Sequence, residues 1–282
     1  MFGSHLSIAG GMNRAVASAV AMGMETVQVF TKNQQQWRVP ELTDDAVRQW
    51  CNECERARFK QTVSHDSYLI NLAAADGLIW RKSVALAIVE HERCERLKIP
   101  YLVMHPGAHL GDGDAVGIRR IVRALNETHA AVPGKTVTCL ESTAGQGTSI
   151  GWRLEHLAEI TAGLKQPERA AVCLDTAHLF AAGYDFRGRK YPNFCREVER
   201  TVGLDRVKVW HLNDSKKDLG SRVDRHEHIG LGRIGLEGFR PIVRDRRWRG
   251  VPKILETAKG VREVDGREWD AVNLEVLRSL AG

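Results

Sequence analysis

Six residues of the types that bind metal ions lie at nearly regular intervals along the chain. They are His65, His105, Glu141, Asp175, His211 and Glu256. Successive members are 40, 36, 34, 36 and 45 residues apart, and each one ends a short apolar run such as 170–175. Burying imidazoles and carboxylates together is costly unless cations compensate their charge. The pattern therefore predicts a cation site where the ends of several strands meet.

Three further residues extend this set to nine. His178 follows Asp175 by three residues, so a turn at the strand exit can bring both side chains into one cluster. Asp224 and His226 lie in the long loop after His211, where the alternative is that they only line the rim of the cleft. Mixed imidazole and carboxylate ligands suit Zn²⁺, with Mn²⁺ or Fe²⁺ as competitors. At about four positions per ion, some of them open to water, nine ligands serve about three zinc ions.

Several other polar residues compete with these candidates. His5, His109 and His228 fall near the same predicted mouth and could replace one of the named ligands. Asp214 is a possible competing ligand or an outer partner of one. The only close cysteine pair, Cys51 and Cys54, has no second pair to complete a zinc site, so we expect free thiols there.

Eight short β-branched runs, each followed by a helical stretch, must position these residues. The runs cover 2–7, 26–30, 61–65, 101–105, 136–141, 170–175, 207–211 and 253–256. The helical stretches cover about 13–22, 43–59, 77–98, 115–131, 154–163, 193–202, 236–244 and 269–280. This alternation predicts a parallel sheet, and eight units fit an α/β fold of the (β/α)₈ TIM-barrel type. A doubly wound open sheet is the alternative. In a barrel, the carboxyl ends of the strands form one mouth, where active sites of this fold lie.

The composition is that of an ordinary globular protein, with 43% hydrophobic and 27% charged residues. With no low-complexity segment or linker, we expect a single domain over 1–282. The chain shows no apolar run of about 20 residues and no secretory signal, so we expect a cytoplasmic protein without a membrane partner. The net charge of +6 permits an acidic partner such as nucleic acid but does not require one.

Taken together, the strand-end residues and their flanking segments resemble endonuclease IV, the zinc-dependent family 2 of apurinic/apyrimidinic (AP) endonucleases. The matching stretches are 30–34, 65–72, 105–107, 141–147, 173–178, 181–185, 211–214, 220–226 and 255–257. The resemblance implies a barrel with three zinc ions. Their implied ligands are His65, His105 and Glu141 for the first ion, Glu141, Asp175, His211 and Glu256 for the second, and His178, Asp224 and His226 for the third.

The resemblance also implies a function in base excision repair. The expected enzyme is a deoxyribonuclease IV that hydrolyses the phosphodiester 5′ to an abasic site in duplex DNA and leaves a 3′-hydroxyl. Removal of blocking groups from 3′ ends is the related activity. Glu141, shared between two ions, and Glu256, which orients the nucleophile, are the implied catalytic residues. We expect the enzyme to act as a monomer.

The expected DNA contacts are Gln35, Tyr68, Leu69 and Arg225. The family often carries an arginine at the position of Gln35, where it inserts into the DNA. Glutamine keeps the hydrogen bonds but lacks the charge and the stacking plane. Two alternatives stay open: a divalent-metal sugar isomerase or epimerase on a similar barrel, and a DNA-binding protein whose metal is only structural.

Overall fold

The computed structural model describes all residues, 1–282, and its centre is a parallel sheet of eight strands curved into a barrel. The strands are β1 (Phe2–Ser4), β2 (Gln28–Val29), β3 (Val63–His65), β4 (Tyr101–Met104), β6 (Val137–Glu141), β8 (Ala170–Asp175), β9 (Val207–His211) and β12 (Lys253–Leu255). Their spatial order is β1-β12-β9-β8-β6-β4-β3-β2, so each strand lies beside its neighbours in the chain. A parallel bridge between His5 and Gln28 joins β1 to β2 and closes the barrel. The predicted barrel is confirmed, and the open-sheet alternative is wrong.

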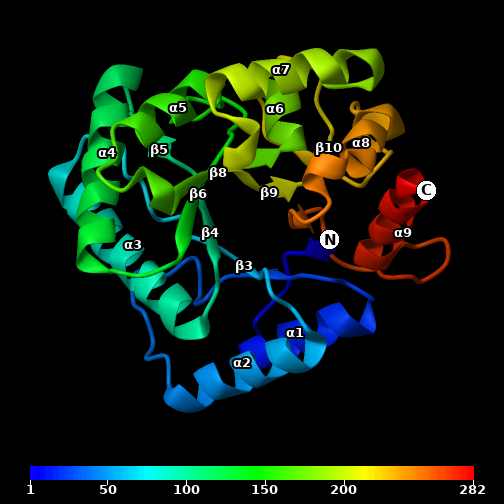
Figure 1. Ribbon diagram of the computed structural model, residues 1–282, viewed down its shortest axis with the longest axis horizontal. Helices are drawn as coiled ribbons and strands as arrows, with labels where there is room; N and C mark the ends of the chain where they lie inside the picture. The colour runs from blue at the N-terminus through cyan, green and yellow to red at the C-terminus, as the bar shows by residue number, and fades with distance from the viewer.

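Helices surround the strands in a ring (Figure 1). They are α1 (Met12–Ala21), α2 (Asp44–Ala57), α3 (Gly77–Leu97), α4 (Asp114–Ala131), α5 (Leu154–Ala162), α6 (Thr176–Ala182), α7 (Tyr191–Thr201), α8 (Gly235–Arg244) and α9 (Trp269–Ala281). Thr43 caps α2 by accepting a hydrogen bond from the Ala46 N–H, so the helix begins where the expected helical stretch 43–59 begins.

The structure differs from the prediction mainly near the mouth of the barrel. β1 and β2 are shorter than the runs 2–7 and 26–30, and α6 replaces the expected turn after β8. Two small antiparallel pairs were not predicted, β5 (Gly107–Ala108) with β7 (Ser149–Ile150) and β10 (Asp214–Ser215) with β11 (His226–Glu227). Such two-residue strands are too short to leave a periodic pattern in a sequence.

The inside of the barrel is filled by a layer of seven buried apolar side chains, which we call the apolar floor. It consists of Val63, Val103, Cys139, Ala171, Cys173, Val209 and Ile254. A separate core of 58 buried residues lies between the strands and the helices. The barrel is therefore a packed body that opens only at its ends.

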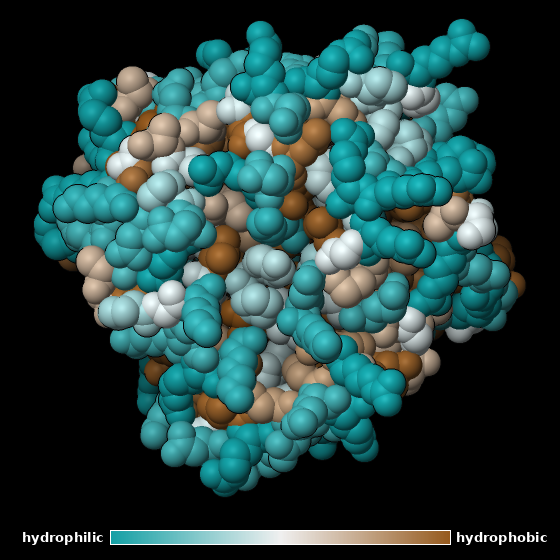
Figure 2. All heavy atoms as spheres, viewed as in Figure 1, coloured by the Kyte–Doolittle hydropathy of each residue, from teal (hydrophilic) through white to brown (hydrophobic).

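Polar side chains dominate the face of the molecule shown in Figure 2, and its hydrophobic side chains occur there as small scattered patches. None of the helices combines the length and the hydropathy that crossing a membrane requires.

Candidate metal centre

The six strand-end residues of the regular series lie directly above the apolar floor. Each follows a floor residue by two positions, as Glu141 follows Cys139 and His211 follows Val209. Because side chains alternate between the two faces of a strand, a residue two positions later points into the same barrel interior. The strand register adds to this alignment, since Asp175 on β8 pairs with His211 on β9.

A first group of potential ligands joins β3, β4 and β6. The Nε2 atoms of His65 and His105 each lie 3.2 Å from Oε2 of Glu141. His65 and Glu141 are buried, whereas the side chain of His105 keeps 39% of its surface exposed and so borders the mouth. The ligand atoms of these three residues all lie within 4.8 Å of one another.

A second group shares Glu141 with the first. Nδ1 of His211 lies 2.9 Å from Oε1 of Glu141, 3.1 Å from Oε2 of Glu256 and 3.9 Å from Oδ2 of Asp175. These four ligand atoms also fit within 4.8 Å of one another. Glu141 thus presents one carboxylate oxygen to each group, which is the arrangement of a carboxylate that bridges two cations.

The third group forms because Asp175 caps helix α6. Its Oδ1 accepts a 2.7 Å hydrogen bond from the N–H of His178, and the first turn of α6 carries that imidazole to the mouth. Asp224 then lies between two imidazoles, with Oδ2 3.1 Å from His178 Nε2 and Oδ1 3.3 Å from His226 Nε2. Asp224 and His226 therefore contact the cluster rather than only lining its rim, and all nine predicted residues meet.

In four of the imidazoles, one ring nitrogen contacts a backbone carbonyl or an amide oxygen, although Nδ1 of His178 also lies 3.3 Å from Oε1 of Glu141. Nδ1 of His65, His178 and His226 lies 2.9, 2.8 and 3.4 Å from the backbone carbonyls of residues 66, 142 and 256, respectively. In His211 the outward atom is Nε2, which lies 2.8 Å from Oε1 of Gln28. An imidazole that donates outward has a lone pair on its inward nitrogen, as a metal ligand requires.

This donor set fits a divalent cation. His226 Nε2 is buried and makes no hydrogen bond, although an oxygen of Asp224 lies 3.3 Å away. An unpartnered nitrogen beside a carboxylate is what a shared cation would satisfy. Imidazoles together with carboxylates are ordinary ligands of zinc.

The electrostatics of the cluster keep Glu141, Glu256 and Asp224 ionised. Burial would raise the pKa of Glu141 and of Glu256, but the neighbouring His211 outweighs burial and holds both well below their usual range. Burial is likewise overcome at Asp224, where the hydrogen bond from His178 lowers the pKa to about 2. For His178 itself, burial opposes the charged form, yet Asp175 and Asp224 raise its pKa well above the ordinary value. In the metal-free protein, protons on imidazoles such as His178 thus balance the negative charge of the carboxylates.

The competing candidates have other roles in the structure. His109 accepts hydrogen bonds from the N–H groups of Gly111 and Gly113, and the ring of His228 stacks on Trp269 at 3.7 Å. Asp214 accepts from several backbone N–H groups of the 230–235 loop, so it shapes this loop and is not free to bind a metal. All six cysteines are free thiols. Although Cys173 lies near His211, burial raises its pKa to about 12, which keeps it protonated.

Strands β1 and β2 also bring polar side chains to the cluster, and one of them, Gln28, was not predicted. His5 follows β1 directly, and its Nδ1 lies 3.4 Å from Oε1 of Glu256. Gln28, on β2, contacts His211, Glu256 and His5. The sequence signal for Gln28 was weak, because the run 26–30 placed it mid-strand and an amide is not a usual metal ligand.

The predicted DNA-contact residues lie around the same mouth. Tyr68 is 64% exposed, and its ring stands edge-on to Phe30 with 5.5 Å between ring centroids. Leu69 beside it is half-buried, and Gln35 and Arg225 are exposed. Cavities of about 250 and 610 Å³ flank the cluster, and Tyr68 contributes to the lining of both.

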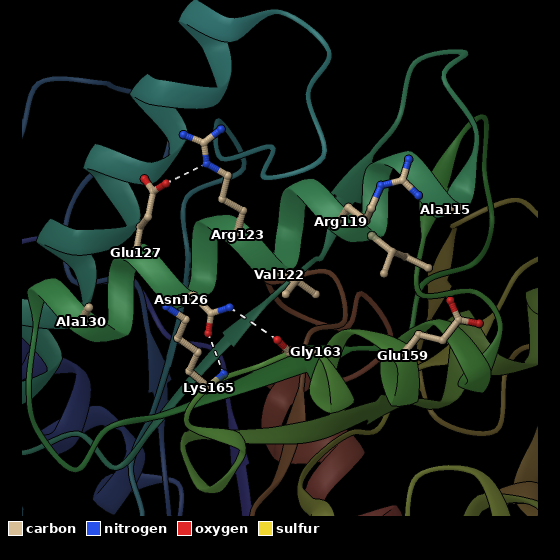
Figure 3. A pocket seen from close by; sticks show the side chains of 11 residues that line it. Ala115, Arg119, Val122, Arg123, Asn126, Glu127, Ala130, Glu159, Gly163 and Lys165 are labelled. Atoms are coloured by element: carbon tan, nitrogen blue, oxygen red, sulfur yellow. Dashed lines mark hydrogen bonds and ion pairs between the residues drawn. The ribbon is translucent and has the colours of Figure 1, made fainter.

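The structure also has a groove of about 870 Å³ on its outer surface, between α4 and α5 (Figure 3). Asn126 crosses it by bonding to the carbonyl of Gly163 and to the N–H of Lys165. Arg123 pairs with Glu127 along one edge. None of the nine cluster residues lines this groove, so the chemistry of the cluster does not extend to it.

Comparison with known proteins gives one consistent result. The family model described as "Xylose isomerase-like TIM barrel" matches residues 16–280. A relative from Geobacter sulfurreducens named "Probable endonuclease 4" is 52% identical over 99% of this chain and 93% of its own length. The crystal structure of endonuclease IV from Thermus thermophilus is 37% identical with a TM-score of 0.87, over 99% of this chain and 98% of that chain. A D-tagatose 3-epimerase-like protein, over 99% of this chain and 96% of its own, has a TM-score of 0.72 at 16% identity, a likeness of fold alone.

Proposed function

Because the chain belongs to the endonuclease IV family, we propose that it is an AP endonuclease of DNA repair that hydrolyses the phosphodiester 5′ to an abasic site in duplex DNA. The product strand would end in a 3′-hydroxyl, and removal of 3′-blocking groups would use the same centre. The observation that carries this proposal is the meeting of five imidazoles and four carboxylates in one accessible mouth, in a chain 52% identical to a probable endonuclease 4.

We propose zinc as the cation, with three ions per chain. The ligand sets would be His65, His105 and Glu141, then Glu141, Asp175, His211 and Glu256, and finally His178, Asp224 and His226. Bound zinc supplies Lewis-acid stabilisation of negative charge on the phosphate and makes hydroxide available near neutral pH. The contacts within each set support this assignment.

The chain's own part in the reaction is to hold the reacting groups in place. Glu141 would fix the spacing of two ligand sets, because each of its oxygens faces a different set. Glu256 is ionised and receives a 2.6 Å hydrogen bond from Gln28 on Oε1, which limits its rotation. From the edge of the mouth this carboxylate would accept a hydrogen bond from the attacking water and so aim it at phosphorus.

Recognition of DNA would come from exposed residues on the rim. We propose that Tyr68 and Leu69 act as a wedge in the base stack, since an abasic nucleotide has no base to unstack and is easily extruded. Arg225 would contact a phosphate, and Gln35 would offer hydrogen bonds without a charge. The exposure of Tyr68, Gln35 and Arg225 on segments that flank the cluster supports these roles.

The proposed activity is tested with zinc-loaded protein and a labelled duplex that holds one abasic site. We expect cleavage 5′ to that site, a 3′-hydroxyl product, and loss of cleavage after chelation. Elemental analysis should give three zinc ions per chain. Absence of cleavage by protein that holds its metal would reject the function, and turnover of a ketose instead would favour the epimerase alternative.

The role of Glu256 is tested by Glu256→Gln at saturating zinc. We expect turnover to fall about 100-fold or more, because a neutral amide accepts a hydrogen bond from the attacking water far less strongly than a carboxylate does. Glu25→Gln is the matched control, since Glu25 pairs with the amino terminus and lies outside the cluster. Near-normal turnover of Glu256→Gln with its zinc retained would remove Glu256 from the mechanism.

We also propose that the protein acts as a monomer in the cytoplasm. Its six free thiols support a reducing compartment. Light scattering of the zinc-loaded protein with and without DNA tests the oligomeric state, and a stable dimer would contradict it.

A further inference from the structure

Gln28 lies where the seam of the barrel meets the metal centre. It is the first residue of β2 and is fully buried. Its backbone forms the bridge to His5 that closes the barrel, and its carbonyl accepts a 2.9 Å hydrogen bond from the N–H of Leu6. The seam thereby fixes the position from which the Gln28 side chain reaches into the cluster.

The amide of Gln28 uses both of its ends on residues of the centre. Oε1 lies 2.8 Å from Nε2 of His211, and Nε2 donates to Oε1 of Glu256 at 2.6 Å and to Nδ1 of His5 at 2.9 Å. Reversing the amide would place its oxygen against the ionised Glu256, so this orientation is the favourable one. Because the amide oxygen can only accept, His211 must carry a hydrogen on Nε2.

This outward bond of His211 differs from those of the other imidazoles. His65, His178 and His226 each donate to a backbone carbonyl, which every sequence supplies. His211 alone among these four depends on a side chain. It is also the imidazole that lies within 3.1 Å of both Glu141 and Glu256. A change at one residue would therefore act on two members of one ligand set.

We propose that Gln28 is a positioning residue of the metal centre, whose amide turns Nδ1 of His211 and Oε2 of Glu256 toward the cation that they share with Glu141 and Asp175. The assignment rests on the proposed metal sites and does not depend on which substrate the centre hydrolyses. Acceptor and donor are both needed, since His211 requires an oxygen and Glu256 requires an N–H group. Outer partners of metal ligands commonly contribute 10- to 100-fold to metal affinity.

Two substitutions test these bonds. Gln28→Met keeps the approximate length of the side chain but removes all three hydrogen bonds, to His211, Glu256 and His5. Gln28→Glu keeps an acceptor for His211 but sets a second carboxylate against Glu256. The matched control is Thr26→Val, which removes a hydrogen bond from the buried Thr26 to the Gln61 carbonyl just before β2 without touching the centre.

The first measurement is zinc affinity, by competition with a chelator of known strength. We expect Gln28→Met and Gln28→Glu to lose about 10- to 100-fold in the affinity of one of the bound ions. Thr26→Val should keep wild-type affinity even if its melting temperature falls. Wild-type affinity in either Gln28 variant, or an equal loss in Thr26→Val, would overturn the proposal.

The second measurement is the ¹⁵N NMR spectrum of zinc-loaded protein labelled at histidine. The wild type and Gln28→Glu should show His211 protonated at Nε2 with Nδ1 bound to metal, and Gln28→Met should lose the hydrogen-bond shift of that Nε2–H. An unchanged signal in Gln28→Met would also overturn the proposal. If the wild type binds zinc but leaves abasic DNA intact, the function is wrong while the role of Gln28 can still be judged.

Discussion

At the scale of single residues, the centre depends on which nitrogen of each imidazole faces inward. His65 and His178 donate from Nδ1 to backbone carbonyls, so their Nε2 atoms are left for a cation. The nine ligand positions could be proposed from the sequence, because each type is a metal ligand and six of them end a strand. The tautomers could not, because they depend on hydrogen-bond partners such as Gln28 that are remote in the chain.

Zinc binding should release protons. The carboxylate of Glu141 outweighs burial and raises the pKa of His65, and Asp175 and Asp224 do the same for His178. His178 thus holds a proton in the metal-free protein at neutral pH and must lose it to bind zinc, and the raised pKa of His65 acts in the same direction, so the affinity should rise with pH. We expect release of about one proton or more per chain at pH 7, measured by titration calorimetry in two buffers of different ionisation enthalpy. His228→Asn, outside the cluster, is the control, and a heat that does not depend on the buffer would contradict the expectation.

At the scale of elements, one strand pattern builds both the floor and the centre. An apolar residue such as Val209 faces the interior, and the residue two positions later, His211, faces the same way one layer higher. This two-residue period allowed the strand ends to be predicted from the sequence. Helix α6 and the β10–β11 pair could not be predicted, because they depend on local polar contacts. These contacts are the cap by Asp175 and the hydrogen bonds of Asp214 to the 230–235 loop.

Helices α3 and α4 each carry one buried histidine outside the metal centre, His91 and His129. Nδ1 of His91 lies 2.8 Å from the carbonyl of Ala87 and donates to it, so its Nε2 accepts from the hydroxyl of Thr138. The same hydroxyl oxygen accepts from Nε2 of His129. The donor and acceptor contacts of His91 are those of a neutral imidazole. Burial lowers the pKa of His91 to about 4, and burial together with the nearby His91 and Arg169 lowers that of His129 to about 3, so both imidazoles are neutral at pH 7.

This histidine pair should make the protein sensitive to acid. The native pKa values lie below the unfolded value near 6.5, so the full contribution to stability is present above pH 6.5 and is lost as pH falls toward 4. For His91 the loss is up to about 3 kcal/mol. Urea unfolding between pH 7.5 and 4.5 should show that the free energy of unfolding falls more steeply with falling pH in the wild type than in the double variant His91→Leu/Thr138→Val. The difference in slope should correspond to the uptake of about one proton on unfolding. Equal slopes would contradict this account.

At the scale of the whole molecule, a chain of positive net charge holds an anionic centre. The chain carries a net charge of +6, while the nine-residue cluster contains four carboxylates. Cations bound in the cluster would reverse its sign, and the positive net charge of the chain would then favour the approach of DNA phosphates to the mouth. The charge pattern of the sequence permitted this reading, but only the family could specify the damaged duplex.

Binding of abasic DNA should therefore weaken as salt rises. Each phosphate that a side chain neutralises contributes about −0.9 to the slope of log affinity against log salt. Arg225→Ala should make this slope shallower by about one, with the zinc content unchanged. Arg48→Ala is the control, because it removes an equal charge from helix α2, where Arg48 pairs with Asp45. Equal slopes for the wild type and Arg225→Ala would mean that Arg225 meets no phosphate.

The seven apolar residues of the floor separate the centre from the opposite end of the barrel. Ions and solvent should therefore reach the ligands only through the mouth, because the floor is closely packed and apolar. A duplex seated on the rim would seal that opening, so bound DNA should protect the centre from chelators. Inactivation by excess chelator should slow several-fold when a non-cleavable abasic duplex is present, whereas an undamaged duplex should protect little. If the two duplexes failed to slow the loss of metal at all, ions would have to escape by another route.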